Sequence, residues 1–149
     1  MTQDMTVFPI VRDVFAGPGP VVHPESAPFW TALGEGRFLV QRCLRCGVVR
    51  FPIAPACHAC LAFEFDWEPL AKSGTVHVAV LVSRAAGRWD GGVPFTAGLV
   101  NMDHGIRLPG RIFCRCGAGS SPGAPVDLCG VPDADGGHVF AFTHDCWQV

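Results

Sequence analysis

The chain has 149 residues, a formal charge of −2 and a hydrophobic share of 49%, with a mean hydropathy of +0.31. This length suits one domain, or a small domain with an added module. A slightly acidic chain is not expected to bind nucleic acid or other polyanions in general. No apolar run reaches the ~20 residues of a transmembrane helix, so we predict no membrane contact.

The first residues lack the charged region, long apolar stretch and cleavage site of a secretory signal. We therefore expect a cytoplasmic protein. Its eight cysteines are then metal ligands or buried thiols rather than disulfides. The 18 glycines and 13 prolines predict many turns and few long helices.

Residues 1–25 are predicted to form an extended N-terminal arm. The segment MTVFPIVRDVF is largely apolar, and the sequence GPGP at 17–20 interrupts it. An apolar arm can dock on another protein or pack back on its own chain, and the sequence leaves both alternatives open.

Residues 26–68 are predicted to contain one short helix followed by a zinc ribbon. Ser26 can cap the helix through its hydroxyl, and a glycine can end it near residue 36. One face of this helix is apolar, and its residues are Phe29, Trp30 and Leu33.

The motif C-x2-C-x10-C-x2-C is the strongest signal in the chain, and its members are Cys43, Cys46, Cys57 and Cys60. Each pair fits a tight turn that points two thiolates at one metal, and two pairs complete a tetrahedral site. Zinc is the usual occupant, and iron in a rubredoxin-like site is the alternative. Because protein fills all four positions, we expect a structural metal.

Residues 69–149 are predicted to form a small β-barrel of the OB type, which makes the chain mainly β. Glycine-rich turns separate five short segments with strand character, at 74–83, 94–102, 106–116, 125–131 and 137–145. The first segment has valines at every second position, as expected for a strand with one buried face.

Four further cysteines fall in this barrel segment, namely Cys114, Cys116, Cys129 and Cys146. We expect them to be buried, small hydrophobic side chains, with the first two on one face of the third strand. A second metal site is the less favoured alternative, because C-x-C is not the usual ligand spacing of a zinc knuckle. No pair of nucleophile and base is recognisable in the sequence, so we predict no catalytic residue.

Several independent motifs occur in a fixed order between residues 26 and 113. They are Phe29-Trp30, the stretch from Gly36 to Gly47, Phe51-Pro52, and Pro94-Phe95 through Asp103, Gly105, Arg107 and Leu108. This order resembles the acyl-CoA-associated OB-fold family that carries an N-terminal rubredoxin-like zinc ribbon. The chain departs from the family pattern at residues 52–56, where an arginine is missing, and from Cys114 onward.

The resemblance implies a non-catalytic accessory subunit of a thiolase-like or ketosynthase-like enzyme. Such assemblies form or cleave C–C bonds, or perform C-acylation, on acyl-CoA or acyl-ketide substrates. The subunit would bridge the assembly and complete or gate its acyl or CoA channel. Docking on the partner is expected through the ribbon and the helix face of Phe29, Trp30 and Leu33.

Arginines are the candidates for contact with the phosphates of CoA, because guanidinium groups match phosphate geometry. We predict this role for Arg84 and Arg88 in one loop, and for Arg107 and Arg111 on one face of a strand. Alternatively, these arginines solubilise an exposed sheet or pair with acidic groups of a partner.

Two other functions remain as alternatives. Zinc ribbons and OB folds both bind oligonucleotides in some proteins, but such a module would be basic and rich in exposed aromatic residues. A stand-alone acyl-transfer enzyme would need its own nucleophile and base.

Overall fold

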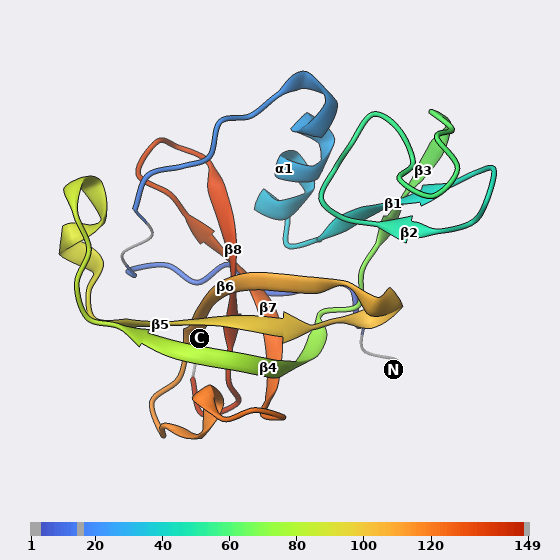
Figure 1. Ribbon diagram of the computed structural model, residues 1–149. Coiled ribbons are helices and arrows are strands. Elements are labelled where there is room, and N and C mark those ends of the chain that lie inside the picture. The colour runs from blue at the N-terminus through green and yellow to red at the C-terminus, as the bar shows by residue number, and fades with distance from the viewer. Residues whose placement is uncertain (1–3, 15–16, 148–149) are drawn as a thin grey trace.

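A computed structural model describes residues 4–14 and 17–147 of the chain. It confirms a mainly β protein with one short helix, a four-cysteine ribbon and an OB-type barrel. Figure 1 shows the barrel with α1 on one side and the small ribbon sheet projecting beside α1. Among the described residues, no helix has the length and apolar character to cross a membrane.

Five strands close the barrel in the order β4-β5-β6-β8-β7, the strand order of an OB fold. Their bounds are β4 Ser73–Val82, β5 Phe95–Asn101, β6 Arg107–Phe113, β7 Pro125–Pro132 and β8 His138–Thr143. All neighbours are antiparallel except β6 and β8, which run parallel with Ile112 opposite Phe142 and Phe113 opposite Thr143. The predicted third strand was too long, because β6 ends at Phe113 and Cys114 and Cys116 lie beyond it.

The ribbon contains a second sheet of three strands in the order β2-β1-β3. Their bounds are β1 Leu39–Cys43, β2 Val49–Arg50 and β3 Phe65–Pro69. The sequence did not predict β3, because the segment FDWEP contains three residue types that are uncommon in strands. Pairing along the whole of β1 stabilises β3 instead.

The single α-helix, α1, spans Ala27–Gly34 and follows the 3-10 turn η1 (Pro24–Ser26). The predicted cap is wrong, because the Ser26 hydroxyl donates to the His23 carbonyl oxygen at 3.0 Å and not to α1. Three further 3-10 turns interrupt the barrel connections, namely η2 (Gly87–Gly92), η3 (Asp103–Gly105) and η4 (Ala118–Ser120).

One hydrophobic core joins the helix, the ribbon and the barrel. Phe38 before β1 contacts Phe29 of α1 and Phe140 of β8, with ring centroids 4.9 and 5.1 Å apart. Leu108 and Phe142 of the barrel belong to the same buried cluster. The ribbon is therefore packed against the barrel through aromatic side chains.

The N-terminal arm packs back on the body around Phe8 and Val11, whereas Val21 and Val22 are exposed. Phe8 and Val11 are buried. The Phe8 N–H donates to the Gly36 carbonyl at 2.9 Å, and the Val11 N–H donates to the Gly130 carbonyl at 2.8 Å. Residues 1–3 and 15–16 of the predicted arm lie outside the described residues.

Candidate metal centre and apolar pocket

The four ribbon cysteines converge at one point. Sγ atoms of Cys43 and Cys60 lie 3.5 Å apart, and those of Cys46 and Cys57 lie 3.7 Å apart. All four sulfurs lie within 4.8 Å of one another. Zn–S bonds of about 2.3 Å place the sulfurs of a tetrahedral site about 3.8 Å apart, so these residues fit the predicted metal.

Two similar turns position the sulfurs. Cys43 ends β1, and the Gly47 N–H donates to the Cys43 carbonyl at 3.0 Å. Gly47 has a φ of +78°, the positive value that closes such a turn. The Leu61 N–H donates in the same way to the Cys57 carbonyl at 2.9 Å, which closes the second turn.

Backbone N–H groups stabilise the thiolate form of some of these cysteines. The N–H of Cys46 lowers the pKa of the Cys43 thiol to about 6. At Cys60, the N–H of Ala62 favours the thiolate, but burial and the neighbouring cysteines outweigh it and raise the pKa to about 11. Without a metal the Cys60 thiol therefore stays protonated at neutral pH, and a bound cation is what holds it as a thiolate.

Gln41 is a supporting residue within the stretch from Gly36 to Gly47, and the sequence indicated no role for it. It is 1% exposed, accepts from the Ala54 N–H at 2.9 Å and donates to the Ala54 carbonyl at 3.0 Å. This side chain ties β1 to the segment that links the two turns. Burial could not be inferred from a single glutamine between Val40 and Arg42.

A pocket of about 370 Å³ lies on the outer face of the barrel. Apolar groups of β5, β6, β7 and β8 line most of it, including Phe95, Phe113, Val131 and Val139. Arg111 carries the only charge among the described lining residues, and its guanidinium lies 5.1 Å from the Phe95 ring centroid. Burial lowers the pKa of Arg111, but a guanidinium stays protonated at neutral pH.

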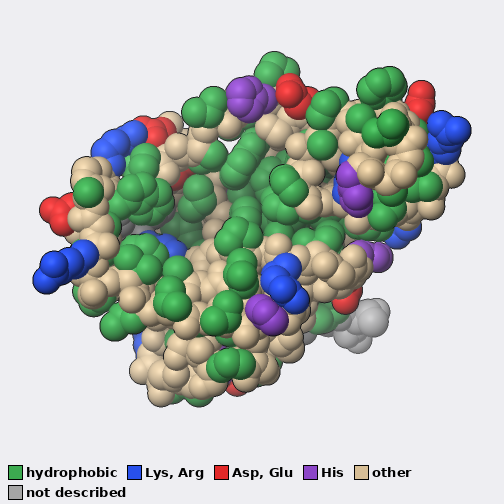
Figure 2. All heavy atoms as spheres, in the orientation of Figure 1, with side chains coloured by type: hydrophobic (Ala, Val, Ile, Leu, Met, Phe, Trp, Pro, Cys, Tyr) green, Lys and Arg blue, Asp and Glu red, His purple; other side chains and the backbone are tan. Residues whose placement is uncertain are grey.

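The four predicted CoA-contacting arginines differ in their surroundings. Arg88 pairs with Asp135 at 2.7 Å, and Arg107 donates to the Asn101 side chain at 2.8 Å. Arg84 is exposed, whereas Arg111 lies in the pocket. In Figure 2 the Lys and Arg side chains on the visible face form separate groups rather than a continuous stripe. Contact with CoA stays a prediction for these residues.

The predicted docking face of α1 is partly used inside this chain. Phe29 is 1% exposed and Leu33 is fully buried, whereas Trp30 is partly exposed. Trp30 therefore offers most of the surface that this face can give to a partner. Docking through α1 stays a prediction.

The remaining cysteines differ from one another in their surroundings. The prediction of a buried hydrophobic side chain is confirmed for Cys129, whose burial raises its pKa to about 12. It is wrong for Cys116, which is exposed, and for Cys114 and Cys146, which are half-buried. These three cysteines lie together around His144.

Two family models match the chain in tandem. The model described as ChsH2, rubredoxin-like zinc ribbon domain, matches residues 30–66. The model described as ChsH2, C-terminal OB-fold domain, matches residues 67–131. The chain belongs to the ChsH2 family. This membership confirms the resemblance that the order of motifs indicated.

Similar solved structures show the same fold. One is described as the Ltp2–ChsH2 (DUF35) aldolase, with a TM-score of 0.74 and 23% identity over 85% of this chain and 98% of that chain. Another is a DUF35 protein of unknown function from Sulfolobus solfataricus, with a TM-score of 0.60 and 14% identity over 83% of this chain and 87% of that chain.

A curated relative carries a name from acyl-CoA chemistry. It is the probable enoyl-CoA hydratase alpha subunit of Thermomonospora curvata, 29% identical over 91 residues. The match covers 61% of this chain and 28% of that relative, so the ChsH2-like chain spans about a quarter of its length.

Proposed function

We propose that this ChsH2 family chain is an accessory subunit of a thiolase-like assembly that acts on acyl-CoA or acyl-ketide substrates. The observation that carries the proposal is the family's ribbon and barrel, joined by one core, with an apolar pocket on the barrel's outer face. Two names among the similar proteins add support. The hydratase relative is named for acyl-CoA chemistry, and the solved aldolase is named for ChsH2 together with a second protein, Ltp2.

The pocket suits one part of such a substrate. Its apolar walls would bury methylene groups at a gain of about 0.8 kcal/mol for each. Arg111 would then face a phosphate, a carboxylate or the thioester end of the same molecule, and its partial burial strengthens such a contact. The subunit would thereby complete an acyl or CoA channel whose reacting groups belong to the partner.

In this proposal the ribbon site holds zinc, and the metal has a structural role. All four positions are filled by cysteine, so no position remains for substrate. The metal would hold the two turns against β1 and β3 and so keep the ribbon in shape for docking. We also place this assembly in the cytoplasm, where thiols stay reduced.

Reconstitution with a partner tests the proposal. The chain is co-expressed with the thiolase-like proteins of its native host, and the products are separated by size-exclusion chromatography with light scattering. We expect one partner to co-elute at a fixed ratio and to turn over acyl-CoA faster than it does alone. Separate elution from every candidate, with unchanged turnover, would overturn the proposal.

A further inference from the structure

A second group of metal-binding side chains lies at one end of the barrel, far from the ribbon in sequence. Cys114 and Cys116 follow β6, and His144 and Cys146 follow β8. Because β6 and β8 run parallel, their C-terminal ends lie side by side (Figure 1). The His144 N–H donates to the Phe113 carbonyl at 3.0 Å, which extends this pairing to the ligands.

The spacing of the ligand atoms matches that of the ribbon site. Sγ of Cys114 lies 3.4 Å from Sγ of Cys146 and 3.6 Å from Sγ of Cys116. Sγ of Cys116 lies 3.5 Å from Nδ1 of His144. The corresponding sulfur distances in the ribbon are 3.5 and 3.7 Å. All four ligand atoms again lie within 4.8 Å of one another.

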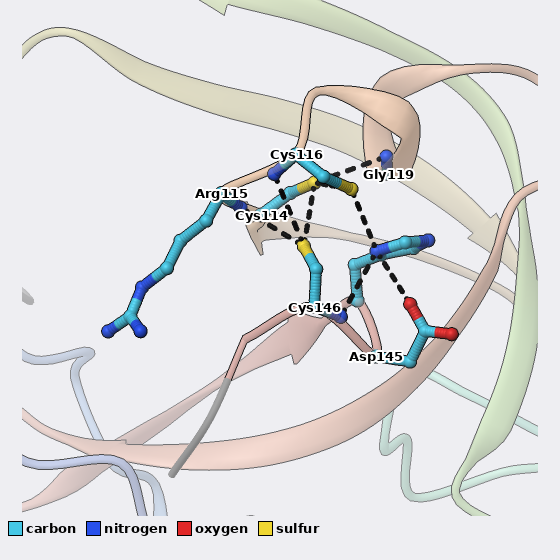
Figure 3. A network of polar contacts seen from close by, with 7 residues as sticks. Cys114, Arg115, Cys116, Gly119, Asp145 and Cys146 are labelled. Carbon is cyan, nitrogen blue, oxygen red and sulfur yellow. Dashed lines mark hydrogen bonds and ion pairs between the residues drawn. The ribbon is translucent and has the colours of Figure 1, made fainter.

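Backbone N–H groups point at the sulfurs, as Figure 3 shows. Those of Arg115 and Cys116 donate to Sγ of Cys146 at 3.2 and 3.4 Å, and that of Gly119 donates to Sγ of Cys114 at 3.2 Å. The ribbon contains the same kind of bond, from the Ala59 N–H to Sγ of Cys57 at 3.4 Å. Such donors stabilise thiolates, which are the form that binds a metal.

Gly119 shows how closely the loop wraps this group. A Cβ atom at this position would lie 2.9 Å from Sγ of Cys114 and 2.9 Å from Cβ of His144. Any side chain here would therefore displace two of the four candidate ligands. The backbone of η4 therefore packs directly against the cluster at Gly119.

Two other interpretations fit the geometry less well. A disulfide needs sulfurs about 2.05 Å apart, and none of these pairs approaches that distance. A catalytic Cys-His-Asp triad needs the thiol and the carboxylate on opposite nitrogens of the imidazole. Here Cys116 and Asp145 both lie against Nδ1 of His144, at 3.5 and 2.9 Å.

We propose that Cys114, Cys116, His144 and Cys146 bind a second structural zinc ion in a tetrahedral Cys3His site. On binding Zn²⁺ the three thiols release their protons to solvent, and the neutral imidazole binds through Nδ1. The exposed Asp145 carboxylate then turns away from that nitrogen.

The second zinc would tie the ends of β6 and β8 together and fix the C-terminal segment on the barrel. Trp147, one residue beyond the last ligand, packs on Phe113 with ring centroids 5.1 Å apart. Arg115, between two ligands, lies over the Trp147 ring at 4.4 Å. The metal thereby holds the aromatic wall next to the pocket of Arg111.

Zinc counting on the full chain tests this inference. The wild-type protein is purified under reducing conditions, and its zinc content is measured by inductively coupled plasma mass spectrometry. We expect two zinc ions per chain, one for each cluster. The double variant Cys114→Ser/Cys116→Ser should hold one. The matched control Cys129→Ala removes a buried cysteine outside both clusters and should keep two.

Two further measurements guard against misfolding of the double variant. His144→Cys supplies a fourth thiolate and should keep two zinc ions, whereas His144→Ala should lose one. Titration of the metal-free wild-type chain with Co²⁺ should show thiolate-to-cobalt absorption that saturates at two equivalents. Saturation at one equivalent, with one zinc per purified chain, would overturn the inference.

Discussion

Arg111 is the residue whose charge matters most for the proposed channel, because it is the charged group in an otherwise apolar pocket. We predict that Arg111→Ala raises the KM of the reconstituted assembly for acyl-CoA by about tenfold, or about 1.4 kcal/mol. Arg107→Ala, at another predicted contact on the same strand, should have a smaller effect, because Arg107 is exposed and bonded to Asn101. Equal KM values for the wild type and both variants would contradict a phosphate or acyl contact.

The pKa of Asp135 tests the ion pair that joins Arg88 of η2 to the loop between β7 and β8. The Arg88 side chain, followed by the Gly19 N–H, holds the pKa of Asp135 below its usual value. A lowered carboxyl pKa adds stability above the unfolded value of about 3.9, and this contribution is lost as pH falls through the folded pKa. In Arg88→Ala the Asp135 pKa should rise toward its usual value in an NMR titration. An unchanged pKa would contradict the ion pair.

At the scale of elements, Gln41 connects β1 to the segment between the metal-binding turns. Replacing it with Met keeps its length but leaves the Ala54 N–H without the Gln41 acceptor, and the Ala54 carbonyl keeps the longer bond from Arg50 at 3.4 Å. We predict a loss of about 1–3 kcal/mol in the free energy of unfolding, measured by urea denaturation. The control Ser73→Ala removes an exposed hydrogen bond to Asp127 and should change stability by less than about 0.5 kcal/mol. Equal effects would show that Gln41 does not support the ribbon.

The strands show which elements a sequence can predict. The alternating valines of β4 and the glycine-rich turns between the barrel strands were sufficient to predict five strands. β3 was missed because tertiary pairing with β1 outweighs its weak intrinsic preference. The end of β6 was placed too late, since Cys114 and Cys116 continue the alternating pattern past Phe113 until Gly117.

The candidate metal sites also differ in how far the sequence predicts them, according to whether their ligands are local in the chain. The ribbon ligands could be predicted because both pairs are local turns with a known spacing. The group around His144 could not, because it depends on the parallel pairing of β6 and β8, which brings together residues about 30 positions apart. The position of Arg111 in an apolar pocket likewise depends on how the barrel closes.

For the whole molecule, the shared core predicts that the ribbon metal supports more than the ribbon. Phe38 and Phe51, on either side of β1 and β2, pack with Phe140 of the barrel. Cys43→Ser should therefore lower the melting temperature of the full chain and abolish co-elution with the partner. The melting temperature is measured by circular dichroism. Wild-type melting and co-elution in this variant would contradict a structural metal.

The most direct test of the central claim is recovery of the tagged chain from lysate of its native host at low salt, with mass spectrometry of what accompanies it. We expect a thiolase-like or ketosynthase-like protein at a constant ratio to the chain. Recovery of the chain alone, or with nucleic acid that nuclease removes, would contradict an accessory subunit and favour a separate enzyme or an oligonucleotide-binding module.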